Sequence, residues 1–221
     1  MPRGTTRVRA RSKNAPHRPI RAVRQRRPTG SPSGREPAGP AWVDRFPGSN
    51  APQACVEPFR SGLIAFLAAL AAAGATVRLN ATLRPPERAY LMHCAWDIAK
   101  NMADPATMPS MPGVDIDWVL RDAAGRPDIP KSRTAARLMV ERFGIVAQAA
   151  LVSRHTQGVA VDMDVSWRGT LSIARHDGSI TQVNGSPRTG MHPDLASVGA
   201  SYGVIKAVFA GDPPHWSNDG H

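Results

Sequence analysis

The ten residues SRHTQGVAVD at positions 153–162 carry the pattern on which our interpretation of this chain rests. His155 opens a turn, Gly158 permits a tight backbone, and Asp162 lies on the strand that we expect over 159–167. A second imidazole, His215, follows much later in the stretch DPPHW at 212–216. Two imidazoles and one carboxylate suit a zinc ion that keeps its fourth tetrahedral position for water. Spacing alone, however, favours a structural hydrogen bond for a histidine–aspartate pair.

The elements around this stretch predict an α+β fold with helices packed on a mainly antiparallel sheet. Apolar residues at 63, 66, 67 and 70 repeat with helical spacing, whereas 75–83 alternates as a strand does. We expect Ser132 to cap a helix that Gly144 ends. The expected helices cover 57–73, 86–102, 133–143 and 193–202, and the expected strands cover 75–83, 145–152, 159–167, 169–174, 180–183 and 204–209.

The basic character of the chain is concentrated at its N-terminal end. The formal net charge is +11, and residues 1–40 hold 11 Lys and Arg but a single acidic residue, Glu36. Residues 1–53 also contain nine of the 21 prolines and show no apolar periodicity. We therefore expect 1–53 to be a disordered basic tail and 54–221 to be the folded domain. The tail is either a solvated segment or an arm for nonspecific contact with an anionic polymer.

Composition excludes two classes of protein. The longest fully apolar run, 63–73, has eleven residues, whereas a membrane span needs roughly 20, so no transmembrane helix is expected. Two cysteines exclude a disulfide-rich scaffold, although Cys55 and Cys94 could pair in an exported protein.

The motif SxHxxGxAxD at 153–162 resembles the zinc D-alanyl-D-alanine carboxypeptidases and related peptidoglycan endopeptidases of the hedgehog-like fold family. In that family a later acidic-x-x-His-Trp motif supplies the third zinc ligand and the general base, and DPPHW at 212–216 has this form. The stretch TLRPPE at 82–87 is similar to the family's substrate-binding segment. The resemblance covers about residues 57–217 and implies the same α+β fold.

The resemblance implies a role for each matching residue. His155, Asp162 and His215 would bind Zn²⁺. Arg84 would bind a carbonyl oxygen or a carboxylate of the substrate, and Ser153 would contact substrate or only stabilise its turn. Trp216 would form one wall of the site and contact substrate. Asp212 would be the general base where the family has Glu, and Asp164, which we expect to be an exposed or supporting carboxylate, is its rival.

Three functions remain open at this point. The first is zinc-dependent hydrolysis of peptide bonds in peptidoglycan stem peptides or crosslinks, by a protein expected to be a monomer. The second is a metal-bearing peptidoglycan-binding module that is catalytically weak or inactive, because the side chain of Asp212 is one methylene shorter than Glu. The third is nucleic-acid binding through the basic tail. A cell-wall substrate implies action in the periplasm or cell wall; without an ordinary signal peptide, we consider a phage lysin, a secreted cargo or a misassigned start codon.

Overall fold

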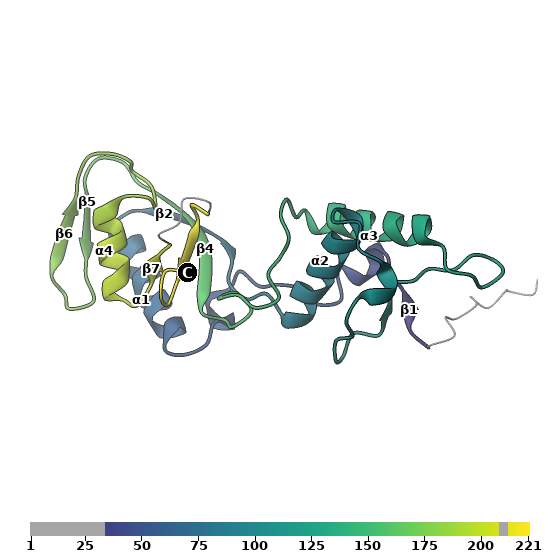
Figure 1. The fold of residues 1–221 in the computed structure, drawn as a ribbon. Coiled ribbons are helices and arrows are strands. Elements are labelled where there is room, and N and C mark those ends of the chain that lie inside the picture. Colours follow the sequence, from purple (N-terminus) through teal and green to yellow (C-terminus); the bar gives the residue numbers. More distant parts are fainter. Residues whose placement is uncertain (1–33, 208–211) are drawn as a thin grey trace, which may run out of the picture.

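The computed structural model describes residues 34–207 and 212–221, which form an α+β protein with two lobes (Figure 1). The helical lobe contains two long helices that pack against each other, and the sheet lobe contains the remaining long helices and most strands (Figure 1). The elements of the sheet lobe are α1 Phe59–Ala72, β2 Thr76–Ala81, β4 Ala160–Ser166, β5 Leu171–Ala174, β6 Ile180–Val183, α4 Pro193–Ser201, β7 Ile205–Lys206 and β8 His215–Ser217. Those of the helical lobe are β1 Glu36–Pro37, α2 Pro86–Ala99, β3 Ile116–Asp117 and α3 Ile129–Phe143, and single 3-10 turns occupy Pro40–Trp42, Pro52–Ala54 and Pro105–Thr107.

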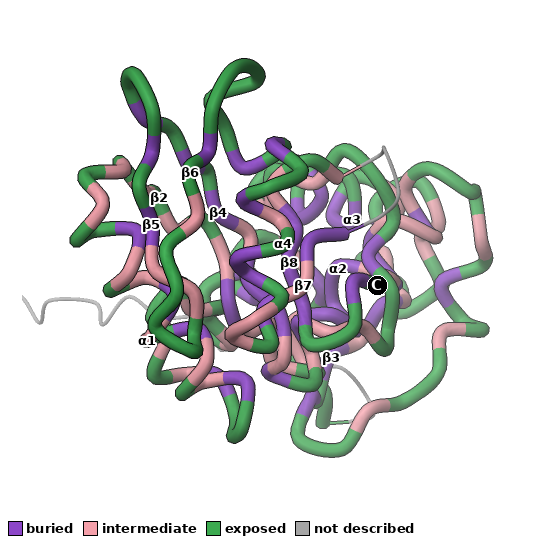
Figure 2. The backbone as a smooth tube through the Cα atoms, turned by 90° about the vertical axis from the view of Figure 1, so that its left-hand side faces the viewer, coloured by how far each residue is buried: buried purple, intermediate pink, exposed green. Residues whose placement is uncertain are grey.

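The main sheet has four strands in the order β2-β4-β8-β7, and all neighbouring pairs are antiparallel. The expected fold class is therefore confirmed. Along β4, Val161 and Met163 point into the core, whereas Asp162 and Asp164 point to the opposite face. Helices α1 and α4 contribute Phe66 and other apolar side chains to the core face, so the opposite face of the sheet remains open. Buried residues run through the centre of the molecule and exposed residues lie in the outlying loops (Figure 2).

A second hydrophobic core lies in the helical lobe, where side chains of α2 such as Leu91 and Ile98 pack with Met139 of α3. Trp42 and Val43 are buried in the same core, at 3% and 4% exposure. Our expectation that the disordered tail extends to residue 53 was therefore wrong. Residues 34–53 belong to the folded part because a few apolar side chains anchor them, despite their high proline content. Residues 1–33 lie outside the described part of the chain.

The helices α1, α2 and α4 and the β5–β6 hairpin confirm the sequence-based expectations, but several other elements differ. Helix α3 begins earlier, at Ile129, because Asp128 accepts a hydrogen bond from the Lys131 backbone N–H and caps it. Residues 145–152 are not a strand, and Val146 is 93% exposed. Strand β8 was not expected, and only 205–206 of the expected strand 204–209 forms β7; positions 208–211 lie outside the described residues.

The two cysteines are free and buried, Cys55 in the core of the sheet lobe and Cys94 in that of the helical lobe. They are therefore not paired. None of the helices in the described part of the chain combines the length and apolar character needed to cross a membrane.

Candidate metal centre

The metal-binding candidates meet where β4 and β8 lie side by side. Asp162 of β4 and His215 of β8 are direct partners in the antiparallel register, so their side chains share the open face of the sheet. His155 comes from the turn before β4. Gly158 reverses the chain in that turn with φ 72°, a conformation that glycine adopts without strain. The sheet register and this turn together bring a residue from each of three segments to one point.

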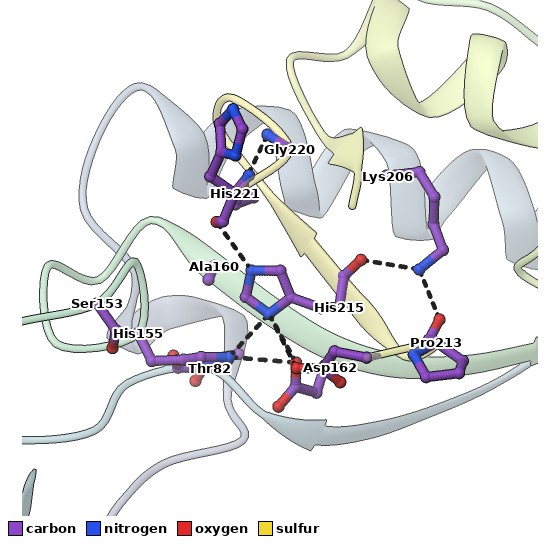
Figure 3. Close-up of polar contacts among 12 residues, drawn as sticks. Thr82, Ser153, His155, Ala160, Asp162, Lys206, Pro213, His215, Gly220 and His221 are labelled. Atoms are coloured by element: carbon purple, nitrogen blue, oxygen red, sulfur yellow. Dashed lines mark hydrogen bonds and ion pairs between the residues drawn. The ribbon is translucent and has the colours of Figure 1, made fainter. Parts of the chain in front are cut away.

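The spacing of the three side chains matches the edges of a tetrahedral zinc site. His155 Nε2 lies 3.1 Å from Asp162 Oδ1 and 3.2 Å from His215 Nδ1, and His215 Nδ1 lies 3.0 Å from Asp162 Oδ1 (Figure 3). Ligand atoms about 2.0–2.1 Å from a tetrahedral zinc ion are about 3.3 Å from one another. His155 and His215 are buried and Asp162 is half-buried, so the three groups could hold a metal ion.

The outer nitrogens of both imidazoles fix which atoms face the centre. His155 Nδ1 donates to the Thr82 carbonyl oxygen at 2.7 Å, and His215 Nε2 donates to the His221 carbonyl oxygen at 3.1 Å (Figure 3). A carbonyl oxygen only accepts, so each neutral ring directs a lone pair at Asp162 Oδ1. Three acceptor atoms within 3.2 Å of one another repel unless a cation lies between them. One proton bridges a single pair, whereas a divalent ion satisfies all three.

The ionisation of these residues indicates the same preference for positive charge. Burial disfavours the charged form of Asp162, but the interactions of this carboxylate with His155 and His215 outweigh burial and hold its pKa well below the usual range. Burial likewise opposes protonation of His215, yet its contact with Asp162 raises the pKa of the imidazole. The candidate centre therefore combines an anionic carboxylate with two imidazoles, a group that could hold a cation.

The candidate centre opens into a cleft of about 430 Å³, whose lining includes three more of the residues named by the sequence. Asp212 Oδ2 lies 4.0 Å from His215 Nδ1, and its side chain is about half exposed. Arg84 is tied to the first ligand through its backbone N–H, which donates to the His155 carbonyl oxygen at 3.1 Å. Ser153 also lines the cleft, and its Oγ accepts a hydrogen bond from the Thr156 backbone N–H at 3.3 Å.

Trp216 does not contact this cleft, and its expected role in substrate binding is therefore wrong. The side chain is fully buried in the core of the sheet lobe and packs on Phe66 with ring centroids 5.6 Å apart. Neighbouring residues on a strand point to opposite faces, so the strand that aims His215 at the metal centre aims Trp216 at the core.

Asp164 is an exposed strand carboxylate, one of the two alternatives that we expected for it. One of its oxygens, Oδ2, accepts hydrogen bonds from Arg78 at 2.7 Å and from Asn80 at 3.1 Å. It shares the open face with Asp162, as the strand period predicts, but it does not line the cleft.

Residues that support the ligands escaped the sequence analysis. Lys206 donates from Nζ to the carbonyl oxygens of Pro213 and His215 and so holds the backbone of β8 (Figure 3). Ser217 Oγ accepts backbone N–H bonds from Gly220 at 2.8 Å and from His221 at 3.1 Å. This turn places the His221 carbonyl oxygen on His215. A backbone contact of this kind leaves no side-chain pattern, and Lys206, Ser217 and His221 lay outside the motifs that the sequence had singled out.

Comparison with known proteins adds no relative to this description. The chain matches no protein-family model, no curated protein and no solved structure. What is established is an α+β protein with a His155–Asp162–His215 group able to hold a metal ion.

Proposed function

We propose that this protein is a zinc-dependent peptidase that hydrolyses peptide bonds in peptidoglycan stem peptides or crosslinks. The observation that carries the proposal is the convergence of His155, Asp162 and His215 at tetrahedral edge distances, in a cleft that Asp212 and Arg84 also line. The choice of peptidoglycan as substrate rests on the resemblance of the motifs at 82–87, 153–162 and 212–216.

The donor set favours zinc over the hard cations. Ca²⁺ and Mg²⁺ prefer oxygen ligands throughout, whereas two imidazoles with one carboxylate are typical of catalytic zinc sites that keep an open position. The same donors also bind Fe²⁺ in oxygenases, and metal analysis of the purified protein distinguishes the two ions. Bound zinc supplies an acidified water and polarises the carbonyl of a peptide bond.

The residues around the centre have complementary tasks in peptide hydrolysis. Asp212 carries a solvent-accessible carboxylate on the cleft wall, where it accepts a proton from the attacking water and passes it to the leaving amine. Arg84 binds the carbonyl oxygen as negative charge develops on it, because a guanidinium is always charged and donates in a planar fork. Ser153 offers its hydroxyl to the substrate from beside the first ligand.

Digestion of purified muropeptides tests the proposal. We expect the zinc-loaded protein to release product, and we expect both a chelator and His155→Ala to abolish release. Asp212→Asn should retain the metal yet lose most activity, whereas Asp164→Asn, which changes a carboxylate outside the cleft, is the matched control and should remain active. Equal product from the wild type, the chelated sample and His155→Ala would defeat the proposal.

One observation favours a second function, a metal-bearing module that binds peptidoglycan without cutting it. The residue at the base position is Asp212, whose side chain is shorter than the Glu of the resembled family. On this alternative Asp212→Glu creates or raises hydrolysis while zinc content stays unchanged. Brisk cleavage by the wild type would exclude it.

A further inference from the structure

A second cleft, of about 310 Å³, adjoins the metal centre on another side of Arg84 and His155, the two residues that line both clefts. Its walls come from both lobes. Ser49 belongs to the segment between the short turns at 40–42 and 52–54, Asn80 to β2, and Arg88 to the first turns of α2. The cleft therefore lies at the junction of the lobes, next to the candidate catalytic centre.

The charged groups lining this second cleft are cationic. Arg84 and Arg88 both line it, and no Asp or Glu does. Among residues 34–207 and 212–221, no carboxylate forms an ion pair with Arg84 or Arg88. The nearby Asp44 pairs with Arg142, and Asp164 accepts from Asn80 and from Arg78. The cleft is thus lined by two arginines, neither of which forms a direct ion pair with a carboxylate in the described part of the chain.

Arg88 is held in place before any ligand arrives. Its NH1 group donates to the Val43 carbonyl oxygen at 2.9 Å, and its guanidinium lies 4.9 Å from the centroid of the Phe143 ring. Burial and then the neighbouring charge of Arg84 lower the pKa of Arg88, and the charge of Asp44 offsets part of this, so the two arginines are close enough to repel each other. A bound anion would relieve this repulsion, and a fixed guanidinium loses little conformational freedom when it binds a carboxylate.

We propose that this second cleft is an anion-binding subsite in which Arg88 binds a carboxylate of the substrate peptide and the positive charge of Arg84, whose guanidinium is assigned to the scissile carbonyl, adds to the attraction. The inference rests on the proposed function, because it assigns the carboxylate to the peptide whose scissile bond lies in the metal cleft. Stem peptides offer two sources of this chemistry, the C-terminal carboxylate and the α-carboxylate of the D-glutamyl residue. Arg84 contacts both clefts, and therefore the subsite couples recognition of the anion to the placement of the peptide.

Ser49 offers a way to change the charge of the subsite while both arginines stay in place. Its Oγ accepts a hydrogen bond from the Ala51 backbone N–H at 3.0 Å. The side-chain oxygen of Asp or of Asn can accept the same bond, since both residues favour such local turns. Ser49→Asp adds a negative charge beside the arginines, and Ser49→Asn is its neutral control of nearly equal size.

Each of the two Ser49 substitutions is made separately in the zinc-loaded full chain that carries Asp212→Asn. Because Asp212→Asn prevents turnover, calorimetric titration then measures binding alone. The probes are N-acetyl-L-Ala-γ-D-Glu-L-Lys-D-Ala, its C-terminal amide and its D-glutamyl α-amide. We expect one amide to bind about tenfold more weakly than the free acid and so to identify the carboxylate. Ser49→Asp should weaken binding of the free acid by roughly tenfold, as expected for a like charge a few ångströms away, and leave that amide unaffected. Ser49→Asn should bind all probes as the parent does, and thermal unfolding of both variants reports whether the fold is intact.

The subsite is refuted if both amides bind as tightly as the free acid, if Ser49→Asp and Ser49→Asn behave alike, or if none of the probes binds. These results are distinguishable from failure of the proposed function. If hydrolysis does not depend on either carboxylate, the proposed peptidase function stands and the subsite is refuted. If the protein binds the probes in a carboxylate-dependent way but never cleaves them, the subsite stands and the proposed peptidase function is refuted.

Discussion

Replacing Ser217 by Ala removes the hydroxyl that organises the turn behind His215. Ser217 is fully buried, and its Oγ accepts backbone N–H bonds from residues 219, 220 and 221 at 3.4, 2.8 and 3.1 Å. This turn presents the His221 carbonyl oxygen to His215 Nε2. Without the hydroxyl, the buried Gly220 N–H loses its partner, and the outer nitrogen of His215 loses a fixed acceptor.

Two magnitudes follow from these contacts. A buried donor left without a partner costs about 1–3 kcal/mol, so the free energy of unfolding of the metal-free protein should fall by that amount. Loss of an outer hydrogen bond on a ligating histidine typically weakens metal binding 10–100-fold, and we expect the zinc affinity of Ser217→Ala to fall within that range. The two effects are separable because the first is measured without metal.

Urea unfolding of the metal-free protein gives the first quantity, and competition with a chromophoric zinc chelator gives the second. Ser179→Ala is a suitable control for loss of a serine hydroxyl, because Ser179 Oγ donates to the Asp177 carboxylate in the exposed turn of the β5–β6 hairpin. The control should change neither value appreciably. A Ser217→Ala protein that binds zinc as tightly as the wild type would refute the argument that the turn at 217–221 orients His215.

Three further predictions concern stability and reactivity. Gly199→Ala places a Cβ 2.7 Å from the Trp216 ring and from the Val204 carbonyl oxygen. Overpacking typically costs about 1–3 kcal/mol, so chemical denaturation should show a free energy of unfolding that is lower by that amount. An unchanged denaturation midpoint would contradict this packing. Zinc at 100 times its dissociation constant should stabilise the fold by about 2.7 kcal/mol, and a chelator should reverse this shift in Tm; a Tm indifferent to zinc and chelator argues against the metal centre. Burial raises the pKa of the Cys55 thiol to about 11 and that of Cys94 to about 12, which favours the neutral thiol in the native state. The associated stability is present below the ordinary thiol pKa and is lost as the pH rises through 11–12. Because the thiolate is the reactive form and both thiols are buried, iodoacetamide at pH 8 should label the two cysteines only in denaturant. Rapid labelling of the native protein would disprove their burial.

The amino-acid sequence by itself determined the elements whose signals are local. Apolar spacing placed the helix that forms at Phe59–Ala72, alternation placed β2, and Gly144 ended α3 in the left-handed conformation that glycine favours. The motif at 153–162 and the later His215 also named the three residues that meet at the candidate metal centre. The elements were predictable because periodicity and turn residues are properties of neighbouring residues, whereas the three candidate ligands were implied by the resemblance of the motifs at 153–162 and 212–216.

Only the tertiary structure decided what depends on partners far along the chain. Trp42 makes 34–53 part of the fold because it is buried in the core to which α2 and α3 contribute, and nothing in its proline-rich surroundings indicates that burial. Trp216 points away from the cleft because β8 pairs with β4 and alternation then fixes its side. The carbonyl oxygens of Thr82 and His221 orient the two imidazoles, and a carbonyl oxygen belongs to every residue type. Backbone partners and the side of a short strand are set by how distant segments meet, and the order of side chains along the chain does not encode them.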